Sequence, residues 1–456
     1  MRRILPLILL LLCFPAAAQA SPRQTVTFEA PRELLSAADR DSTLDQIASF
    51  GVNRVRQLVY WRSYAPDPDS RTRPDFDASN PDAYPPGTWD NLDALVAAAK
   101  ARGITVMMTL TGPVPKWATK AKKDNLTDPD PKQFGQFVTA VSRRYAADVD
   151  TWSIWNEPNQ PQFLKPQYKK GKPVSPKLYR KLYQAAYKAL RATNPTDAIL
   201  IGETSPRGNQ NVVHPLAFLR GMLCLDSKYR KAKSCGKLDA DGYAHHAYTT
   251  SQGPRFKPPS KDDVTIGVLS RLVSALDKAA RARAIPKHLP IHLTEFGIQS
   301  TPDKIAGVSL ARQAAYLALS EHIAYVNPRV VAFSQYLMSD DPPRSEGYKY
   351  GGFESGLRTS SGKAKPAYEG FRLPLAVEVY GNDDVLWGLV RPQRSATQVT
   401  IERKPKGKSW RTLRTLTTTA TGVYGLKTSH HKGQQYRVKW TAPDGQTYTG
   451  PAIQGY

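Results

Sequence analysis

Cysteine is scarce in this sequence, and its scarcity narrows the possible kinds of site. Only three cysteines occur among 456 residues, and Cys13 falls in a segment that we expect to be removed on export. The other two, Cys224 and Cys235, flank a lysine-rich stretch. We therefore expect one disulfide that closes a short surface loop. No histidine lies at ligand spacing from either cysteine, so we expect no zinc site there. Separately, for the function predicted below, we expect no metal and no organic cofactor.

Long apolar runs are also missing. The run from Ile4 to Phe14 is shorter than the roughly 20 residues that a membrane span needs, and no later segment qualifies. It follows Arg2 and Arg3 and precedes an Ala-Gln-Ala sequence that ends at Ala20, which is the layout of a cleaved secretory signal. We expect residues 1–20 to be a signal peptide and the protein to be secreted, extracellular or in the cell envelope, with no membrane span.

Acidic residues are outnumbered by basic ones. The chain has 39 Asp and Glu against 64 Lys and Arg, which gives a formal net charge of +25. Such a charge suits nucleic acid, an anionic membrane surface, an acidic polysaccharide, or solubility alone. The basic residues are scattered, with no basic helix, zinc finger or aromatic RNA-binding motif to concentrate them. We expect no nucleic-acid partner, favour solubility, and keep an anionic glycan as a hypothesis.

Two kinds of segment alternate up to about residue 370. Short runs rich in β-branched residues precede longer amphipathic stretches, which is typical of βα units. Eight strands is the number of a TIM barrel, so we predict an α/β fold in which residues 21–373 form a (β/α)8 barrel. The predicted strands are Thr25–Glu29, Val52–Val59, Ile104–Leu110, Thr151–Trp155, Ala198–Gly202, Ala240–His246, Pro290–Thr294 and Val330–Tyr336, and the predicted helices are Ser42–Phe50, Trp89–Arg102, Pro131–Tyr145, Pro176–Thr193, His214–Leu225, Val264–Ala284 and Ser309–Val326.

The composition changes after Leu373. Short runs rich in Val, Thr, Tyr and Trp are broken there by Gly-Asn-Asp, Lys-Gly-Lys and Pro-Asp-Gly, which indicates an all-β segment. Gln398–Arg403 and Gln435–Trp440 alternate apolar and polar residues, as half-buried strands do. We predict that residues 374–456 form a small C-terminal β-sandwich module.

Two glutamates stand where a barrel places its chemistry, at the carboxyl ends of strands. Glu157 follows Thr-Trp-Ser-Ile-Trp-Asn after the fourth predicted strand, and Glu295 follows Ile-His-Leu-Thr after the seventh. Cleavage of a glycoside with retention needs one protonated and one ionised carboxyl group, about 5 to 5.5 Å apart. The alternative is that each glutamate only ends a strand and pairs with a nearby Lys or Arg. The presence of both favours catalysis.

The sequence around these glutamates resembles a known group of enzymes. Trp-Asn-Glu-Pro-Asn at 155–159 and Thr-Glu-Phe-Gly at 294–297 are similar to the signatures of clan A glycoside hydrolases, and the likeness, closest to families 39 and 5, covers the whole barrel. The resemblance implies that Glu157 is the acid/base and Glu295 the nucleophile. It also implies that Asn156 holds the 2-hydroxyl of the sugar, a contact that strengthens in the transition state.

Further positions match the clan pattern. His246 and Tyr248 resemble a His-x-Tyr pair that lines the site and steadies the nucleophile. His245 would face the other way on an extended strand, where it would pack or support the site. Arg56 resembles an arginine that can keep the nucleophile ionised, with Arg54 as the alternative.

The last predicted strand departs from the clan pattern. It ends Phe-Ser-Gln-Tyr-Leu, where many clan members have a tryptophan as the floor of the −1 subsite, so Tyr336 or Gln335 would take that place. Other aromatic residues in the loops after the strands could either stack on sugars or pack in the core. These are Trp61, Tyr64, Trp117, Trp155 and Phe163.

Together these features predict a monomeric, secreted retaining glycosidase that acts on a polysaccharide, oligosaccharide or glycoconjugate. The alternative from another class is a non-catalytic barrel protein that binds carbohydrate or the cell envelope. Transglycosylation would use the same residues. The sugar, the linkage, the choice between endo and exo action and the role of the C-terminal module stay open, because loop sequences do not translate into a sugar.

Overall fold

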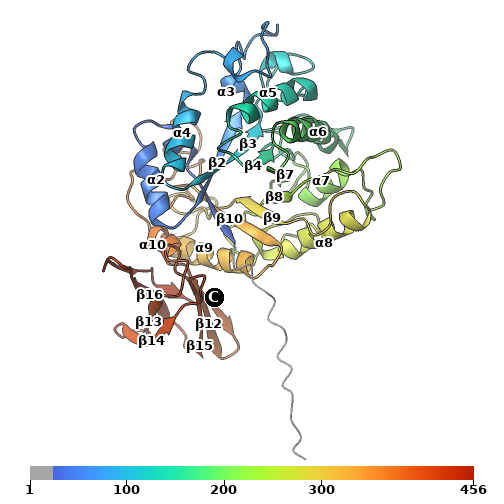
Figure 1. The fold of residues 1–456 in the computed structure, drawn as a ribbon. Coiled ribbons are helices and arrows are strands. Elements are labelled where there is room, and N and C mark those ends of the chain that lie inside the picture. Colours follow the sequence, from blue (N-terminus) through green and yellow to red (C-terminus); the bar gives the residue numbers. More distant parts are fainter. Residues whose placement is uncertain (1–23, 456) are drawn as a thin grey trace, which may run out of the picture.

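The protein is a closed barrel of parallel strands with a smaller β module attached (Figure 1). The computed structural model describes residues 24–455, and the signal peptide predicted for residues 1–20 lies outside them. In the described part the barrel order is β1-β10-β9-β8-β7-β4-β3-β2, which confirms the predicted (β/α)8 fold. The barrel strands are β1 Thr25–Glu29, β2 Arg54–Tyr60, β3 Thr105–Thr111, β4 Thr151–Ile154, β7 Ala198–Thr204, β8 Gly242–His246, β9 Ile291–Glu295 and β10 Val330–Tyr336.

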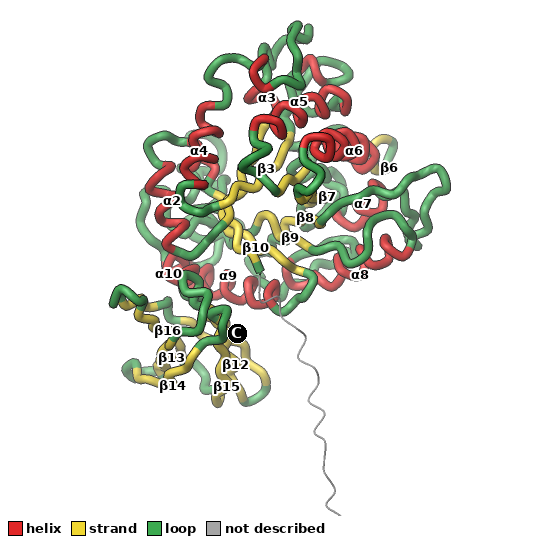
Figure 2. Tube along the Cα trace, viewed as in Figure 1, coloured by secondary structure: helices red, strands yellow, loops and turns green. Residues whose placement is uncertain are grey.

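Helices surround this barrel as an outer ring (Figure 2). Their inner faces bury apolar side chains against the strands, as in α5, where Phe134, Phe137 and Val141 are buried. Proline begins several of them, and Asp130 caps α5 by accepting from two backbone N–H groups. The α-helices are α1 Pro31–Leu35, α2 Arg40–Ser49, α3 Trp61–Tyr64, α4 Asp90–Lys100, α5 Pro131–Arg144, α6 Ser175–Thr193, α7 Pro215–Met222, α8 Leu269–Arg281, α9 Leu310–Tyr325 and α10 Pro366–Arg372.

One helix begins later than the sequence pattern indicates. The helix predicted from Val264 begins at Leu269, after a single 3-10 turn, η3 Ile266–Val268. A Cβ on Gly267 would meet the carbonyl oxygen of Pro254 at 2.5 Å. This close approach fixes the segment before α8 against a preceding loop, so it cannot join the helix. The remaining short elements are η1 Pro81–Ala83, η2 Lys116–Ala118 and the hairpin β5 Tyr168–Lys169 and β6 Lys172–Pro173.

The C-terminal module consists of two antiparallel sheets that lie beside α9 and α10 (Figure 1). A buried ion pair joins it to the barrel, with Nη2 of Arg391 2.6 Å from Oε2 of Glu321 on α9. Apolar residues of both sheets share one core cluster with the barrel. The strands are β11 Leu375–Tyr380, β12 Asp383–Leu389 and β15 Val423–Ser429 in one sheet, and β13 Gln398–Lys404, β14 Arg411–Thr417, β16 Gln435–Thr441, β17 Thr447–Thr449 and β18 Ile453–Gln454 in the other.

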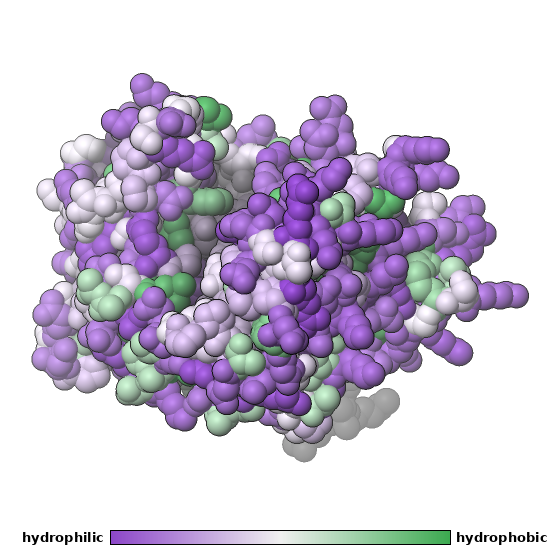
Figure 3. Space-filling view, turned by 90° about the horizontal axis from the view of Figure 1, so that it is seen from above, coloured by the Kyte–Doolittle hydropathy of each residue, from purple (hydrophilic) through white to green (hydrophobic). Residues whose placement is uncertain are grey.

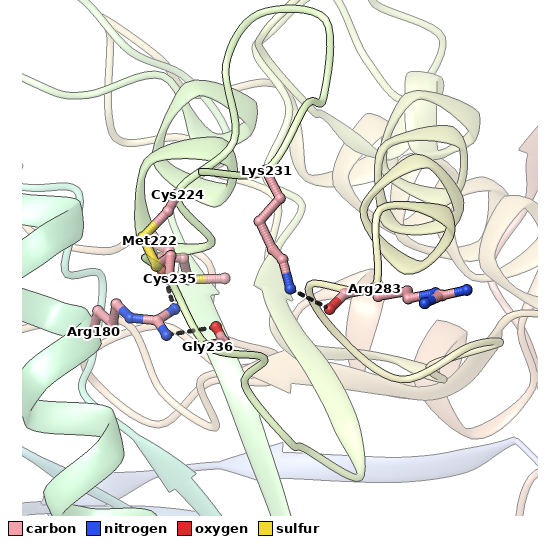
Figure 4. The surroundings of a disulfide bond; sticks show 7 residues. All are labelled: Arg180, Met222, Cys224, Lys231, Cys235, Gly236 and Arg283. Carbon is pink, nitrogen blue, oxygen red and sulfur yellow. Dashed lines mark hydrogen bonds between the residues drawn. A yellow bond between two sulfur atoms is a disulfide. The ribbon is translucent and has the colours of Figure 1, made fainter. Parts of the chain in front are cut away.

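A disulfide joins Cys224 and Cys235, as the cysteine spacing predicts. It closes the loop that follows α7, and the Arg180 side chain of α6 lies next to it (Figure 4). The Arg180 guanidinium donates to the carbonyl oxygens of Met222 and Gly236, one on each side of the bridge. The disulfide therefore joins the two ends of the loop to each other, and this arginine fixes both ends to α6.

The molecular surface is mainly hydrophilic on the face seen in Figure 3, with small and separate apolar areas. In the sequence the basic residues are spread along the chain rather than gathered in one segment. Between residues 24 and 455, no helix has both the length and the apolar character that crossing a membrane requires.

Candidate active site

A cavity of about 600 Å³ opens where the barrel strands end. Both predicted catalytic residues, Glu157 and Glu295, line it. They are 138 positions apart in the chain, and only β7 and β8 separate their strands, β4 and β9, in the barrel. Tyr60 at the end of β2 and Tyr336 at the end of β10 contribute aromatic walls. The strand-end positions therefore converge on one cavity, as is typical of barrel enzymes.

The backbone around the first glutamate is strained. Trp155 and Glu157 have φ values of 68° and 37°, in the left-handed region that residues with a Cβ seldom adopt. Hydrogen bonds to the neighbouring strand hold this conformation, because the Trp155 N–H donates to the Leu110 carbonyl and the Asn156 N–H donates to Thr111 Oγ1, each at 2.9 Å. Such strain gathers at functional sites, where the surrounding structure enforces it.

Each oxygen of the Glu157 carboxylate has one protein partner. Gln160 donates from Nε2 to Oε2 at 2.8 Å, and Nδ1 of His246 lies 2.9 Å from Oε1. Glu157 itself is 9% exposed and faces the cavity. The carboxyl group is thus oriented by two side chains while one edge stays accessible to a ligand.

The Glu295 carboxylate is also held at both oxygens. The Tyr248 hydroxyl donates to Oε1 at 2.7 Å, and Nη1 of Arg56 donates to Oε2 at 3.2 Å. Nδ1 of His246 lies 3.5 Å from the same Oε2. His246 is therefore placed between the two glutamates, with one ring nitrogen near both.

Arg56 lies at the centre of the site and is fully buried. Besides Glu295, its guanidinium donates to Glu29 at 2.7 Å, to Glu203 at 2.9 Å and to Asn156 Oδ1 at 2.8 Å. Burial opposes its charge, but the surrounding carboxylates outweigh burial and raise the pKa of Arg56 above its ordinary value. The structure thus places Arg56, rather than Arg54, in contact with the carboxyl groups of the site.

The alternative arginine, Arg54, is the first residue of the same strand. Its side chain donates to Thr105 Oγ1 at 3.2 Å and lies 3.9 Å from Asp150, far from the cavity lining. Because side chains on one face of a strand are two residues apart, both arginines share a face but only Arg56 reaches the carboxyl end of the barrel.

Two further buried glutamates belong to the site, and the sequence analysis missed both. Glu29 ends β1 and Glu203 lies in a β-bulge of β7 with a φ of 51°, and neither has any exposed surface. The rule that singled out Glu157 and Glu295 would have found them, since each stands at the end of a predicted strand. Nothing in the sequence shows that their side chains turn inward to Arg56.

The pKa values of these two carboxyl groups shift in opposite directions although both touch Arg56. Burial raises the pKa of Glu29, even though Arg56 acts in the opposite direction. Burial would also raise the pKa of Glu203, but the charges of Arg56 and His246 outweigh it and lower the pKa to about 2. Glu203 is therefore a buried carboxylate at neutral pH.

The pKa values of His246 and His245 shift in opposite directions, although the two residues are adjacent in the sequence. Burial opposes the charge of His246, but the carboxylates of Glu295, Glu157 and Glu203 outweigh it and raise its pKa to about 10. Its Nε2 lies 2.6 Å from Glu203. His245 faces away from the site, toward Thr204 Oγ1 and the Val264 carbonyl, and burial lowers its pKa to about 4.

The last strand places Tyr336, not Gln335, in the cavity wall. Gln335 is buried and donates to the Leu337 and Ser355 carbonyls. Of the loop aromatic residues, Phe163 lines the cavity. The others are buried in the core and pack there, namely Trp61, Tyr64, Trp117 and Trp155. Across residues 24–455, no group of three or more His, Cys, Asp or Glu side chains is arranged to hold a metal ion.

Comparisons with known proteins agree with this fold. Similar solved structures include a glucosidase from Croceicoccus marinus (13% identity, 92% of this chain and 95% of that one, TM-score 0.55), a family 39 glycoside hydrolase from the gut symbiont Bacteroides cellulosilyticus WH2 (16%, 91% and 81%, 0.52), and GH5_18 from Streptomyces cattleya in complex with GlcNAc (17%, 76% and 79%, 0.52). At these identities the likeness shows the fold alone.

The family itself is shown by sequence. A search of curated proteins found no match. The family described as "Cellulase (glycosyl hydrolase family 5)" matches residues 20–329, which is most of the barrel and more than half of the chain. This match confirms the resemblance to clan A and implies a carbohydrate substrate. The chain therefore belongs to glycosyl hydrolase family 5 and is an O-glycosyl hydrolase.

Proposed function

We propose that this enzyme cleaves O-glycosidic bonds of a polysaccharide or glycoconjugate with retention, with Glu157 as acid/base and Glu295 as nucleophile. One observation carries the proposal: Nδ1 of His246 lies 2.9 Å from Glu157 Oε1 and 3.5 Å from Glu295 Oε2. Glu157 Oε1 and Glu295 Oε2 are therefore at most 6.4 Å apart, the sum of 2.9 and 3.5 Å. That separation supports the short spacing of a retaining pair over the wider spacing that leaves room for a water in inverting enzymes.

The surroundings of Glu295 suit its proposed part as the attacking carboxylate. In the first step Glu157 gives its proton to the leaving oxygen while an oxygen of Glu295 attacks the anomeric carbon and forms a covalent glycosyl-enzyme. In the second step Glu157 takes a proton from water, and that water displaces Glu295. Arg56 and Tyr248 keep the attacking carboxylate in place through both steps.

Asn156 is positioned to contact the sugar that reacts. Its Oδ1 accepts a hydrogen bond from Arg56 at 2.8 Å, which directs its Nδ2 amide group toward the cavity that it lines. An amide fixed in this way can donate to the 2-hydroxyl, and such a contact strengthens as the oxocarbenium-like transition state forms. Tyr336 supplies the adjacent wall, where many clan members have a tryptophan.

Glutamine variants test the assignment. We expect Glu157→Gln and Glu295→Gln each to lose nearly all turnover of aryl glycosides and polysaccharides, because neither amide can transfer the proton or attack the sugar. Glu346→Gln changes an exposed glutamate outside the cavity and is the matched control, which should keep wild-type activity. Full activity in both variants would refute the assignment of these two residues, whereas a wild type that binds carbohydrate without turnover would favour a binding role for the barrel.

We also propose that the enzyme works outside the cytoplasm. The Cys224–Cys235 disulfide supports this location, because such bonds persist in oxidising compartments. Export predicts cleavage after Ala20, so N-terminal sequencing of protein secreted by a host that expresses the full chain should begin at Ser21. Retention of Met1 in the secreted or cell-associated protein would contradict the proposal.

A further inference from the structure

One arginine stands in the wall of the catalytic cavity, and its side chain has no hydrogen-bond or ion-pair partner among residues 24–455. Arg344 lies in the segment between β10 and α10 and lines the same cavity as Glu157 and Glu295. It is the one lysine or arginine in that lining, as far as residues 24–455 show. Arg56, the other nearby cation, is fully buried beneath the cavity and already surrounded by carboxylates. A ligand that enters the cavity therefore meets the charge of Arg344.

No carboxylate of the described residues lies within ion-pair distance of the Arg344 guanidinium. The nearby loop carboxylate, Asp341, is engaged elsewhere, because it accepts the Phe353 N–H at 2.8 Å and lies 3.7 Å from Arg32. The guanidinium instead rests over Gly351, where a Cβ would meet Nη1 at 3.2 Å. Its donors are thus left for solvent or a ligand.

An aromatic ring lies beside this cation in the cavity wall. Phe353 is 42% exposed, which is unusual for a large apolar side chain, and it packs edge-on against Tyr336 with ring centroids 5.0 Å apart. Exposed aromatic rings offer an apolar face on which a sugar can lie. Arg344 and Phe353 together therefore present a charge and a stacking surface to one ligand.

The segment that carries these residues is anchored at its base by buried polar contacts. Lys365 donates from Nζ to Asp340 at 2.6 Å, to Ser300 Oγ at 2.9 Å and to the Glu354 carbonyl at 3.2 Å. Both Lys365 and Asp340 are almost fully buried. Because its two ends are fixed to each other, the segment can hold its side chains in the cavity before a ligand binds.

We propose that Arg344 recognises an anionic group on the glycan, so that the substrate of this enzyme carries a carboxylate, as in a uronic acid, or a sulfate ester. This inference rests on the proposed glycosidase function and names the substrate class of that site. The guanidinium can donate two parallel hydrogen bonds to either group, which a neutral hydroxyl cannot match. The positive charge of the whole chain would attract such a polymer to the surface.

Matched pairs of oligosaccharides test this proposal. One pair contains a uronate oligosaccharide and the same compound with its carboxylates reduced to alcohols, and the other contains a sulfated oligosaccharide and its desulfated form. Turnover is measured with the wild type, and affinity is measured by calorimetry with Glu157→Gln. We expect kcat/KM to favour the anionic member of one pair by about tenfold, as one charge-assisted contact at a partly exposed site allows.

Amino-acid substitutions then test whether Arg344 causes the preference for the anionic oligosaccharide. Arg344→Gln should lower kcat/KM for the anionic member by about tenfold and leave the neutral member unchanged, and Arg344→Lys should give an intermediate value. Lys349→Gln removes the same charge from the same segment but outside the cavity lining, so it should behave as the wild type. The pair that responds distinguishes the carboxylate from the sulfate.

Two results would overturn the inference. One is a wild type with no preference for an anionic member in turnover or binding, and the other is an Arg344→Gln variant that affects both members of a pair equally. Failure of the proposed function would look different. Glu157→Gln and Glu295→Gln would then remain active, whatever the preference that Arg344 confers.

Discussion

Replacing Glu203 with glutamine removes one charge from the buried network but keeps the size of the side chain. The Glu203 carboxylate lies 2.9 Å from Arg56 and 2.6 Å from His246, and all three side chains are fully buried. The variant leaves both cations with one partner fewer, and its amide N–H groups face donors rather than acceptors. We therefore expect the fold to lose stability at neutral pH.

The magnitude follows from the pKa of this carboxyl group. Arg56 and His246 overcome the effect of burial and lower the pKa of Glu203 from 4.5 to about 2. At about 1.4 kcal/mol for each pH unit, this difference corresponds to about 3 kcal/mol. Removal of one partner from other buried ion pairs costs a similar 3 to 5 kcal/mol, on the order of magnitude. We expect the free energy of unfolding to fall by about 3 kcal/mol at pH 7.

Urea unfolding followed by tryptophan fluorescence at several pH values measures this effect. A depressed pKa stabilises the native state above pH 4.5, and the contribution disappears as the pH falls toward 2. The difference in the free energy of unfolding between wild type and Glu203→Gln should therefore be about 3 kcal/mol at pH 7 and decrease below about pH 4.5. Glu346→Gln, which changes an exposed residue with no ion-pair partner within the described part of the chain, should stay within about 0.5 kcal/mol of wild type. The reasoning would be refuted if this difference in unfolding free energy were absent at pH 7 or did not change with pH.

Two more perturbations address the C-terminal module and the segment that carries Arg344. Arg391→Met breaks the buried pair with Glu321 and should cost about 3 to 5 kcal/mol in thermal or urea unfolding, whereas the double variant with Glu321→Leu should recover most of this loss. If the double variant is no more stable than the single one, the Arg391–Glu321 ion pair does not explain how the C-terminal module is held against the barrel. Burial raises the pKa of Glu354 to about 7, so its contribution to stability is full below pH 4.5 and is lost as the pH rises to 7. Glu354→Gln should remove that part of the pH dependence between pH 5 and 8, and an unchanged slope would argue against it.

The barrel could be predicted because its pattern is local. The first strand, Thr25–Glu29, and the last, Val330–Tyr336, have the predicted bounds, since each is a short apolar run with clear ends. The other barrel strands differ by a few residues at their ends. The late start of α8 could not be read from the sequence, because it depends on how closely Gly267 approaches the backbone of the loop around Pro254.

The site was only partly predictable, for a related reason. Sequence motifs named Glu157 and Glu295, but the inward turn of Glu203 depends on a β-bulge that no local pattern shows. The position of Arg344 in the cavity depends on a long segment whose base is fixed by Lys365. Contacts between distant parts of the chain decide both features, and one sequence alone does not reveal them.

Azide rescue of alanine variants tests the central assignment most directly. In Glu295→Ala, azide can take the place of the missing nucleophile, so we expect restored turnover of an activated aryl glycoside and a glycosyl azide with the opposite anomeric configuration to the substrate. In Glu157→Ala, azide should instead attack the glycosyl-enzyme and give a product with the configuration of the substrate. The reverse pattern would exchange the two roles, and a wild type that releases sugar of inverted configuration would contradict the retaining mechanism.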